Sequence, residues 1–271
     1  MALPNPRPDR TAVVTGASSG IGAEIARELA TRSHGVTLVA RRTELLETLA
    51  AELRGRGVRA EVLAADLNDR SARAELLGRV TDLGLEPHVL VNNAGFSTVG
   101  PVHSSDPDRE LSMIEVDVAT VADLCTRFLP GMVERGNGAV LNVASTAAFQ
   151  PLPGQAGYAA CKAFVLSYTR SLNAELAGTG VTATALCPGP VKTGFGEAAG
   201  FTEGEADSAL PSFMWEPADA VARCGLDALA KGAPVAIPGT ANRVSATLAN
   251  LAPKRLLVPL LAKQHPGLRD S

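Results

Sequence analysis

The sequence predicts an α/β fold built on one doubly wound parallel sheet, and two observations lead to this fold class. Short runs of Val, Ala, Leu and Ile alternate along the chain with longer segments in which apolar residues recur every three or four positions. These are the patterns of buried strands and amphipathic helices. Hydrophobic residues make up 46% of the 271 residues and aromatic residues only 4%, which is typical of parallel sheets covered by helices.

The expected strands and helices follow one another almost throughout. The runs that predict strands are residues 11–15, 36–40, 58–64, 88–91, 139–143, 181–186 and 234–237. The segments that predict helices are residues 21–32, 44–54, 70–83, 107–135, 156–177 and 217–230. Such alternation implies right-handed crossovers that place helices on both faces of the sheet. No linker or short-period repeat divides the chain, so we expect residues 1–271 to form a single domain.

Residues 192–216 interrupt this alternation. The segment contains glycines, acidic residues and isolated apolar residues, which are Phe195, Phe201, Phe213, Met214 and Trp215. A long irregular segment in a compact domain is more often functional than accidental. We interpret it as a mobile lid over an apolar substrate, and an exposed loop without function is the alternative.

A helical tail is expected at about residues 240–264. Its leucines are flanked by Lys and Arg, and Pro253 and Pro259 interrupt it. Such a segment could contact a membrane surface. The favoured interpretation is a terminal helix that covers the core or makes a subunit contact.

Charge and composition exclude several classes of function. The net charge is −3 and no basic stripe is present, which argues against nucleic acid as a partner. Neither the cysteines nor the histidines cluster, so we expect no disulfide framework and no metal site. The N-terminus has no apolar signal core, and no run of about 18 apolar residues occurs. We therefore expect a cytoplasmic protein.

A glycine-rich turn separates the first strand from the first helix. It reads Thr15-Gly-Ala-Ser-Ser-Gly-Ile-Gly22. Small residues let backbone amides approach a pyrophosphate, and the N-terminus of a helix favours an anion. Because the strand–turn–helix context is the one that this motif requires, the turn predicts a dinucleotide site.

The second strand ends in Ala40-Arg41-Arg42. A carboxylate at this point would hold the ribose 2′-hydroxyl of NAD. Here an alanine is followed by two guanidinium groups, which suit a 2′-phosphate. The sequence therefore favours NADP(H) over NAD(H), and two solvated surface arginines are the alternative.

Tyr158 and Lys162 are four residues apart in a predicted helix, so their side chains lie on one face. A lysine cation beside a phenol favours the phenolate and lowers its pKa toward the working range. The pair can therefore act as one acid–base device. Taken alone, the spacing is weak because most such pairs are neighbours on a solvated helix.

Further motifs add to these features. They are Asp66-Leu67, Asn92-Asn-Ala-Gly95, Ser145 and Pro188-Gly189. With the glycine turn and the Tyr158-x-x-x-Lys162 pair, in this order and spacing, the chain resembles the short-chain dehydrogenase/reductases from about residue 10 to residue 237. Each piece could occur by chance, but the set is highly specific.

The resemblance implies a Rossmann-type fold and a role for each matching residue. The cofactor phosphates would be held by Gly16, Ser18, Ser19, Gly20, Ile21 and Gly22, and the extra phosphate by Arg41 with Arg42 beside it. The adenosine side would contact Asp66, Leu67, Asn93, Ala94 and Gly95. The nicotinamide end would contact Pro188, Gly189, Val191 and Thr193. Ser145 would bind the substrate oxygen and Tyr158 would exchange its proton. Lys162 would bind the ribose and acidify Tyr158.

Two positions depart from the family pattern. The family commonly has an asparagine in the helix at 107–135, which contributes to a proton relay near the lysine, and Asp117 stands in its place. If the relay uses the backbone carbonyl, the substitution is nearly silent, which we favour. Otherwise proton transfer is impaired or its pH optimum is raised, because a negative charge raises the pKa values of Lys162 and Tyr158. Cys161 replaces a serine, and we expect a packed thiol in preference to a reactive one.

The resemblance implies an NADP(H)-dependent oxidoreductase that interconverts a carbonyl and an alcohol. The substrate would be apolar, such as a lipid-like, steroid-like or aromatic carbonyl compound. A homodimer or homotetramer would form through the helices at 107–135 and 156–177. The alternative is an NADP(H)-binding regulatory or scaffold protein with little or no turnover.

Overall fold

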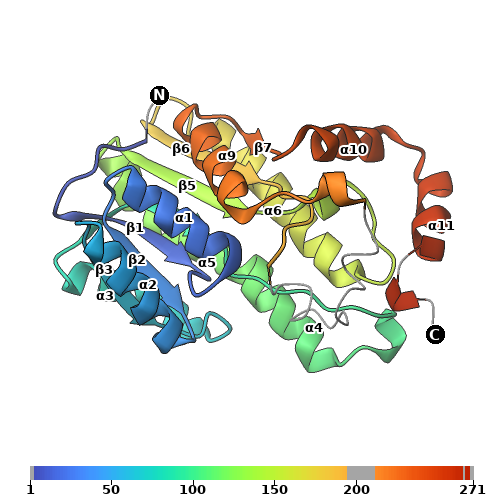
Figure 1. Ribbon diagram of the computed structural model, residues 1–271, viewed down its shortest axis with the longest axis horizontal. Coiled ribbons are helices and arrows are strands. Elements are labelled where there is room, and N and C mark those ends of the chain that lie inside the picture. The colour runs from blue at the N-terminus through green and yellow to red at the C-terminus, as the bar shows by residue number, and fades with distance from the viewer. Residues whose placement is uncertain (1–2, 194–210, 265, 269–271) are drawn as a thin grey trace.

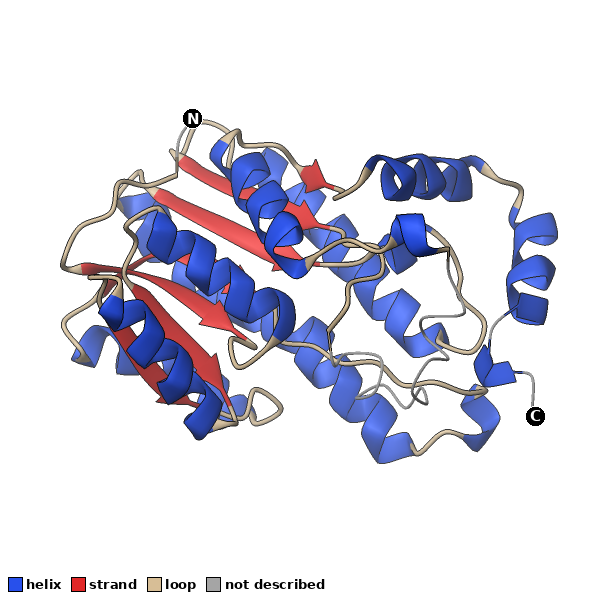
Figure 2. Cartoon of the chain, in the orientation of Figure 1, coloured by secondary structure: helices blue, strands red, loops and turns tan. Residues whose placement is uncertain are grey.

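The computed structural model describes residues 3–193, 211–264 and 266–268, and it confirms the predicted fold class. One seven-stranded parallel sheet has the order β3-β2-β1-β4-β5-β6-β7, with helices on both of its faces (Figures 1 and 2). The strands are β1 (Arg10–Thr15), β2 (Val36–Ala40), β3 (Ala60–Ala64), β4 (Glu86–Asn92), β5 (Gly138–Val143), β6 (Val181–Leu186) and β7 (Val235–Ala236).

The helices that follow the first six strands are α1 (Gly20–Thr31), α2 (Thr43–Gly55), α3 (Arg70–Asp82), α4 (Pro107–Ile114), α5 (Thr120–Glu134), α6 (Ala156–Glu175) and α9 (Ala218–Ala230). Two more helices, α10 (Thr240–Leu251) and α11 (Lys254–Gln264), follow β7 and lie beyond that edge strand at one end of the molecule (Figure 1). No helix in the described part of the chain is both long and apolar enough to cross a membrane.

The side chains of β1 alternate between two hydrophobic layers. Ala12 and Val14 pack in a cluster that contains residues of α1, α2 and α9, such as Ile25. Val13 belongs to the opposite cluster, which contains residues of α3, α5 and α6, such as Phe128. A strand covered on both faces must be apolar at every position, which is why the predicted strands are nearly continuous runs of Val, Ala and Leu.

The order of the strands determines where a ligand site can form. β1 lies between β2 and β4, so the connections that leave β1 and β4 run in opposite directions. In open α/β sheets this reversal opens a crevice beyond the carboxyl ends of the two strands. The glycine turn follows β1 and residues 93–95 follow β4, so the two segments meet at this crevice.

The predicted helical segment 107–135 is helical from Pro107 to Glu134, but it contains a turn that the pattern did not predict. A π-helical turn, η2 (Glu115–Ala119), separates α4 from α5. The hydroxyl of Thr120 donates a hydrogen bond of 3.0 Å to the carbonyl oxygen of Glu115, which satisfies a group at the widened turn. A single inserted residue barely disturbs the hydrophobic period, so the pattern does not reveal it. Such turns occur frequently at functional sites, and this one contains Asp117.

Candidate active site

The glycine turn has no room for larger residues at two of its positions. Gly16 has φ +64°, and a Cβ atom there would lie 2.8 Å from Cα of Ala94. A Cβ atom at Gly22 would collide with the carbonyl oxygen of Gly16. Ser19 precedes α1 without a side-chain cap, which leaves the first backbone N–H groups of the helix available. The turn therefore fits the phosphates of a dinucleotide.

The end of β4 is fixed to this turn by hydrogen bonds. The hydroxyl of Thr15 accepts from the backbone N–H groups of Asn93 at 2.9 Å and Ala94 at 3.1 Å. The side-chain amide of Asn93 donates to the carbonyl oxygens of Thr15 at 3.0 Å and Gly16 at 3.2 Å. Asn93 and Ala94 therefore lie directly against the glycine turn and the start of α1.

Of the two arginines after β2, Arg42 contacts the glycine turn. Its Nη2 atom lies 2.9 Å from the hydroxyl of Ser18 and 2.8 Å from that of Ser19. Arg41 is exposed beside it. The guanidinium group of Arg42 thus contacts the serines that are predicted to bind phosphate. The family resemblance implies Arg41 for the extra phosphate, with Arg42 beside it.

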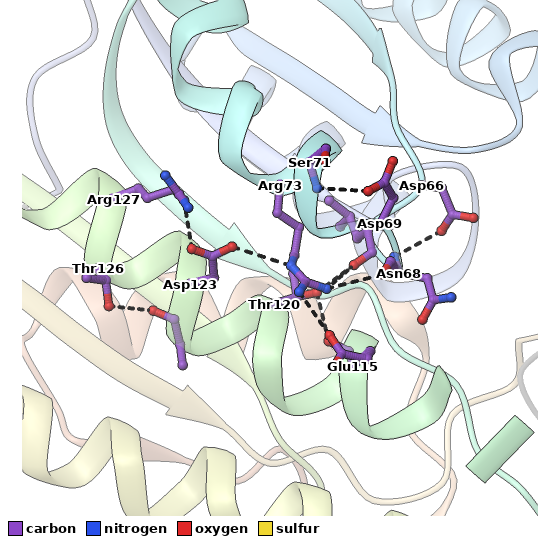
Figure 3. A network of polar contacts seen from close by, with 12 residues as sticks. Asp66, Asn68, Asp69, Ser71, Arg73, Glu115, Thr120, Asp123, Thr126 and Arg127 are labelled. Carbon is purple, nitrogen blue, oxygen red and sulfur yellow. Dashed lines mark hydrogen bonds and ion pairs between the residues drawn. The ribbon is translucent and has the colours of Figure 1, made fainter. Parts of the chain in front are cut away.

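The loop after β3 is held by a network of polar contacts (Figure 3). Asp66 accepts from the backbone N–H of Asn68 at 3.0 Å, which shapes the turn. The carbonyl oxygen of Leu67 accepts from Nη1 of Arg73 at 2.8 Å and from the hydroxyl of Thr120 at 3.1 Å. Of the two residues predicted to lie along the adenine, Leu67 is therefore fastened to α3 and to the start of α5, and Asp66 shapes the loop.

Arg73 is the central residue of this network and was missed by the sequence analysis. Its side chain is 4% exposed, and its guanidinium group pairs with Glu115 at 2.9 Å and Asp123 at 3.4 Å (Figure 3). It links the loop after β3 to the π-helical turn. The sequence contains a signal for this role. Arg73 shares the buried face of α3 with Leu76 and Val80, and a buried charge must be paired.

The predicted proton-transfer residues lie together at the crevice. Tyr158 and Lys162 are both buried on α6, and Nζ of Lys162 is 5.6 Å from the centre of the phenol ring. Nζ donates to the carbonyl oxygen of Val143 at 3.2 Å. It also lies 2.7 Å from Oδ1 of Asp117, whose side chain is fully buried.

Asp117 is fixed by the segment that follows β4. Its Oδ2 atom accepts from the backbone N–H of Phe96 at 3.0 Å. A Cβ atom at Gly95 would lie only 2.7 Å from Oδ1 of Asp117, so the close approach of the carboxylate requires glycine there. Direct contacts thus run from the glycine turn through Ala94 and Gly95 to Asp117 and Lys162.

Ser145 stands at the end of β5 and starts a 3₁₀ turn, η3 (Thr146–Phe149). Its hydroxyl accepts from the backbone N–H of Ala147 at 3.1 Å. The same hydroxyl hydrogen-bonds the phenol of Tyr158 and favours its ionised form. Ser145, Tyr158 and Lys162 therefore converge, as their spacing in the sequence predicts.

Lys162 lowers the pKa of Tyr158 as expected, but it does not decide the net direction of the shift. Burial raises the pKa of the phenol above its ordinary value, and it outweighs the lowering by Lys162 and Ser145. Burial also opposes the charge of Lys162, but the Asp117 carboxylate overcomes it, so the pKa of Lys162 is raised. Lys162 is therefore held firmly as a cation, and Tyr158 keeps its proton at neutral pH.

The predicted nicotinamide end follows β6 and packs against α10. The backbone of Thr146 donates to the carbonyl oxygen of Pro188 at 2.8 Å. A Cβ atom at Gly189 would collide with the side-chain amide of Asn242, a fully buried residue of α10. Thr193 approaches the glycine turn, because a Cβ atom at Gly20 would lie 3.2 Å from its Cγ2 atom.

Most of the predicted lid, including Phe195 and Phe201, lies outside the described residues. At its end, η4 (Ser212–Met214) leads to a parallel bridge between Glu216 and Val191. Phe213 is exposed. The amide of Asn242 donates to the carbonyl oxygen of Met214 at 2.9 Å, which ties this segment to α10.

Cys161 is buried beside the site. Burial raises the pKa of its thiol to about 11, so the thiol stays protonated at neutral pH. This supports the packed thiol over the reactive one.

In the ranges that the structure describes, no group of three His, Cys, Asp or Glu side chains has the arrangement of a metal site.

Comparison with known proteins places this geometry in a family. The family profile described as short chain dehydrogenase matches residues 10–203. A short chain dehydrogenase of Pseudocercospora fijiensis is 39% identical over 190 residues, which span 69% of this chain and 61% of that protein. A putative ketoacyl reductase of Streptomyces coelicolor is 39% identical over 184 residues, 67% of this chain and 70% of that protein.

A solved structure matches over most of the chain. The short-chain dehydrogenase from Sphingobium yanoikuyae in complex with NADPH has a TM-score of 0.78 and 31% identity. The alignment covers 92% of this chain and 95% of that one. The similarity thus extends over the sheet and over the segments that border the crevice.

Proposed function

The chain belongs to the short chain dehydrogenase family, and on this premise we propose that it is an NAD(P)-dependent oxidoreductase acting on a carbonyl or alcohol. One observation carries the proposal: Tyr158, Lys162 and Ser145 lie together, and direct contacts connect them to the glycine turn through Gly95 and Asp117. A bound nicotinamide would supply or accept the hydride at the substrate carbon. The residues around it must then handle the oxygen and its proton.

Tyr158 is the general acid and base of this proposal. In the reducing direction its phenol donates a proton to the substrate oxygen, and in the oxidising direction it accepts one. Ser145 donates a hydrogen bond to the same oxygen and stabilises negative charge that develops there. Lys162 counters the negative charge of the phenolate and would hold the nicotinamide ribose. Its raised pKa keeps it a cation throughout.

Asp117 is a positioning residue in this scheme. It contacts Nζ of Lys162 and the backbone of Phe96, so it determines where the ammonium lies relative to Tyr158. Its negative charge raises the pKa of both residues. We propose that the carboxylate orients Lys162 and is itself not a proton carrier.

We propose that NADP(H) is preferred over NAD(H). Ala40 provides no carboxylate for a ribose hydroxyl, and Arg42 reaches the hydroxyls of Ser18 and Ser19. A guanidinium group at this point suits a phosphate with two negative charges. Arg41 adds a second positive charge close by.

The substrate that fits best is an apolar carbonyl compound. Phe213, Met214 and Trp215 stand at the described end of the predicted lid, close to the nicotinamide segment through Asn242. Apolar side chains with a few convergent polar groups are the usual lining of a small-molecule site.

We also propose self-association through the outer faces of α4, α5 and α6. Leu111, Ile114, Val133 and Phe164 are exposed on these helices. Exposed apolar side chains on adjacent helices are a common basis of homodimer interfaces.

The direct test follows the absorbance of NADPH with a panel of apolar ketones. We expect oxidation of NADPH by the wild-type protein with at least one class of ketone. Tyr158→Phe should lower the rate of this oxidation by about a hundredfold or more while NADPH still binds, as measured by cofactor fluorescence.

A regulatory or scaffold protein is the second candidate. The observation in its favour is the ion pair between Asp117 and Lys162, which engages the ammonium that the proton relay needs. NADPH binding without oxidation by any ketone of a broad panel, and without a change in Tyr158→Phe, would support this candidate over the enzyme.

A further inference from the structure

We propose that the outer faces of α10 and α11 bind a membrane surface that carries anionic lipids. On α10, Val244, Leu248 and Leu251 recur at positions i, i+4 and i+7 and are exposed, whereas Asn242 and Ala246 face the body of the protein. This is the apolar stripe of an amphipathic helix, turned outward.

α11 continues the same feature. Leu256 and Leu260 are four residues apart and exposed. The five outward residues of the two helices, Val244, Leu248, Leu251, Leu256 and Leu260, are called the tail face below. Their side chains are 52–75% exposed. These five residues therefore do not cover the core, whereas Ala246 of α10 is buried and Leu257 and Leu261 of α11 are half-buried.

The charge of this segment is unlike that of the rest of the chain. From Lys231 to Arg269 the sequence contains six Lys and Arg residues and no Asp or Glu, although acidic residues outnumber basic ones in the whole protein, 28 to 25. Among the described residues, Arg243, Lys254, Arg255 and Lys263 form no ion pair with a carboxylate. The tail face thus belongs to a segment whose described positive charges pair with no carboxylate, although the ammonium of Lys254 also donates to the carbonyl oxygens of Phe149 and Ala249.

Charge complementarity selects the lipid surface over a second copy of the chain. In a symmetric dimer the same patch meets itself, so the basic residues would face one another and repel. An anionic lipid surface attracts every one of them, and the exposed leucines can enter the region between headgroups and acyl chains. The proposal is for interfacial contact, because α10 and α11 have 12 and 11 residues and spanning needs about 20.

The outward position of these leucines allows a clean set of variants. Leu248→Glu with Leu256→Glu removes apolar contact and adds negative charge without touching Asn242, which packs on Gly189. Arg255→Glu with Lys263→Glu changes charge alone. Leu45→Glu is the matched control, since Leu45 is an exposed leucine of α2 outside this segment.

The experiment is co-sedimentation of the full chain with vesicles. One set contains phosphatidylcholine alone, and the other contains phosphatidylcholine with one quarter phosphatidylglycerol. We expect binding to the anionic vesicles only, weakened by salt. Both double variants should bind about tenfold or more weakly. Each positive charge near an anionic surface strengthens binding by about fivefold, and each introduced glutamate is repelled by that surface. Leu45→Glu should bind as the wild type does. Circular dichroism checks that every variant is folded.

Two outcomes would overturn the proposal. Equal binding to both kinds of vesicle, or no binding to either, would exclude an anionic lipid surface as the partner. If light scattering then shows that the leucine variant alone converts an oligomer to a smaller species, the tail face belongs to a second copy. These readouts do not depend on turnover, so they stand or fall separately from the proposed enzymatic function.

Discussion

The ammonium of Lys162 lies 2.7 Å from the carboxylate of Asp117, and both groups are buried. The pair joins α6, which carries Tyr158, to the π-helical turn η2 between α4 and α5. Because Asp117 also accepts from the backbone of Phe96, its carboxylate has little freedom to move. The acid–base pair of Tyr158 and Lys162 is therefore a group of three residues in this protein.

Asp117→Asn should keep turnover and have an equal or lower pH optimum. The carboxylate raises the pKa of both Lys162 and Tyr158, so its removal lowers both values and shifts proton transfer toward lower pH. Asparagine can still accept from the backbone of Phe96. The measurement is the pH dependence of kcat, with Asp219→Asn as a control, because Asp219 is an exposed residue of α9 that pairs with Arg223. A large loss of turnover across all pH values would show that the carboxylate takes a direct part in catalysis.

Tyr158→Phe should lower turnover by about a hundredfold to ten-thousandfold, which is the usual contribution of a positioned general acid. Tyr168→Phe is the matched control, since these are the two tyrosines of the chain and Tyr168 lies further along the same helix. Steady-state kinetics with the best ketone, together with NADPH binding, separate the chemical step from cofactor affinity. Unchanged turnover in Tyr158→Phe would contradict the assignment.

Arg42→Ala should raise KM for NADPH by about tenfold to a hundredfold, as expected for the loss of a charge-assisted contact. KM for NADH should change little, since NADH has no 2′-phosphate. Arg56→Ala provides the control, because Arg56 at the end of α2 pairs only with Glu52 at 2.6 Å among the described contacts. Equal effects on both cofactors would assign Arg42 to folding of the glycine turn instead.

Arg73→Met should destabilise the protein by about 2 kcal/mol, because Glu115 and Asp123 lose a partner but remain partly solvated. It should also weaken NADPH binding, since the carbonyl of Leu67 then keeps only Thr120. Urea unfolding and cofactor titration measure the two effects. Arg79→Met, on the same helix with one contact to the carbonyl of Ala64, should change neither by a comparable amount.

The sequence predicts the sheet and the central residues of the site because both depend on local patterns. The glycine turn and the Tyr158–Lys162 spacing are defined by residues close together in the chain. The order of strands then brings their neighbours together through general rules of topology. This explains why Asn93, Ser145 and Tyr158 lie where their motifs predict.

The residues that were missed act over long distances in the sequence. Asn242 is an unremarkable polar residue of the tail, and only the folded chain places it on Gly189. The π-helical turn is invisible to periodicity, yet it carries Asp117 into contact with Lys162. The raised pKa of Tyr158 likewise depends on its burial, which the spacing of two residues does not specify.

The stability of the protein should fall in mild acid because of a buried pair of histidines far from the site. Nδ1 of His34 lies 2.8 Å from Nε2 of His88, and both side chains are buried. Burial lowers the pKa of His34 to about 4 and that of His88 to about 3. The unfolded chain, with pKa values near 6.5, therefore binds more protons than the folded one as the pH falls below about 6.5. The stability that the two neutral histidines contribute is complete above this pH and is lost toward pH 4, with a slope of up to about 1.4 kcal/mol per pH unit for each histidine.

Urea unfolding at about pH 7.5, 6 and 5 measures this slope. His34→Gln should make it shallower, whereas His103→Gln, an exposed histidine in η1 (Val102–Ser104), should leave it unchanged. An identical slope in His34→Gln would show that other groups control the response to acid.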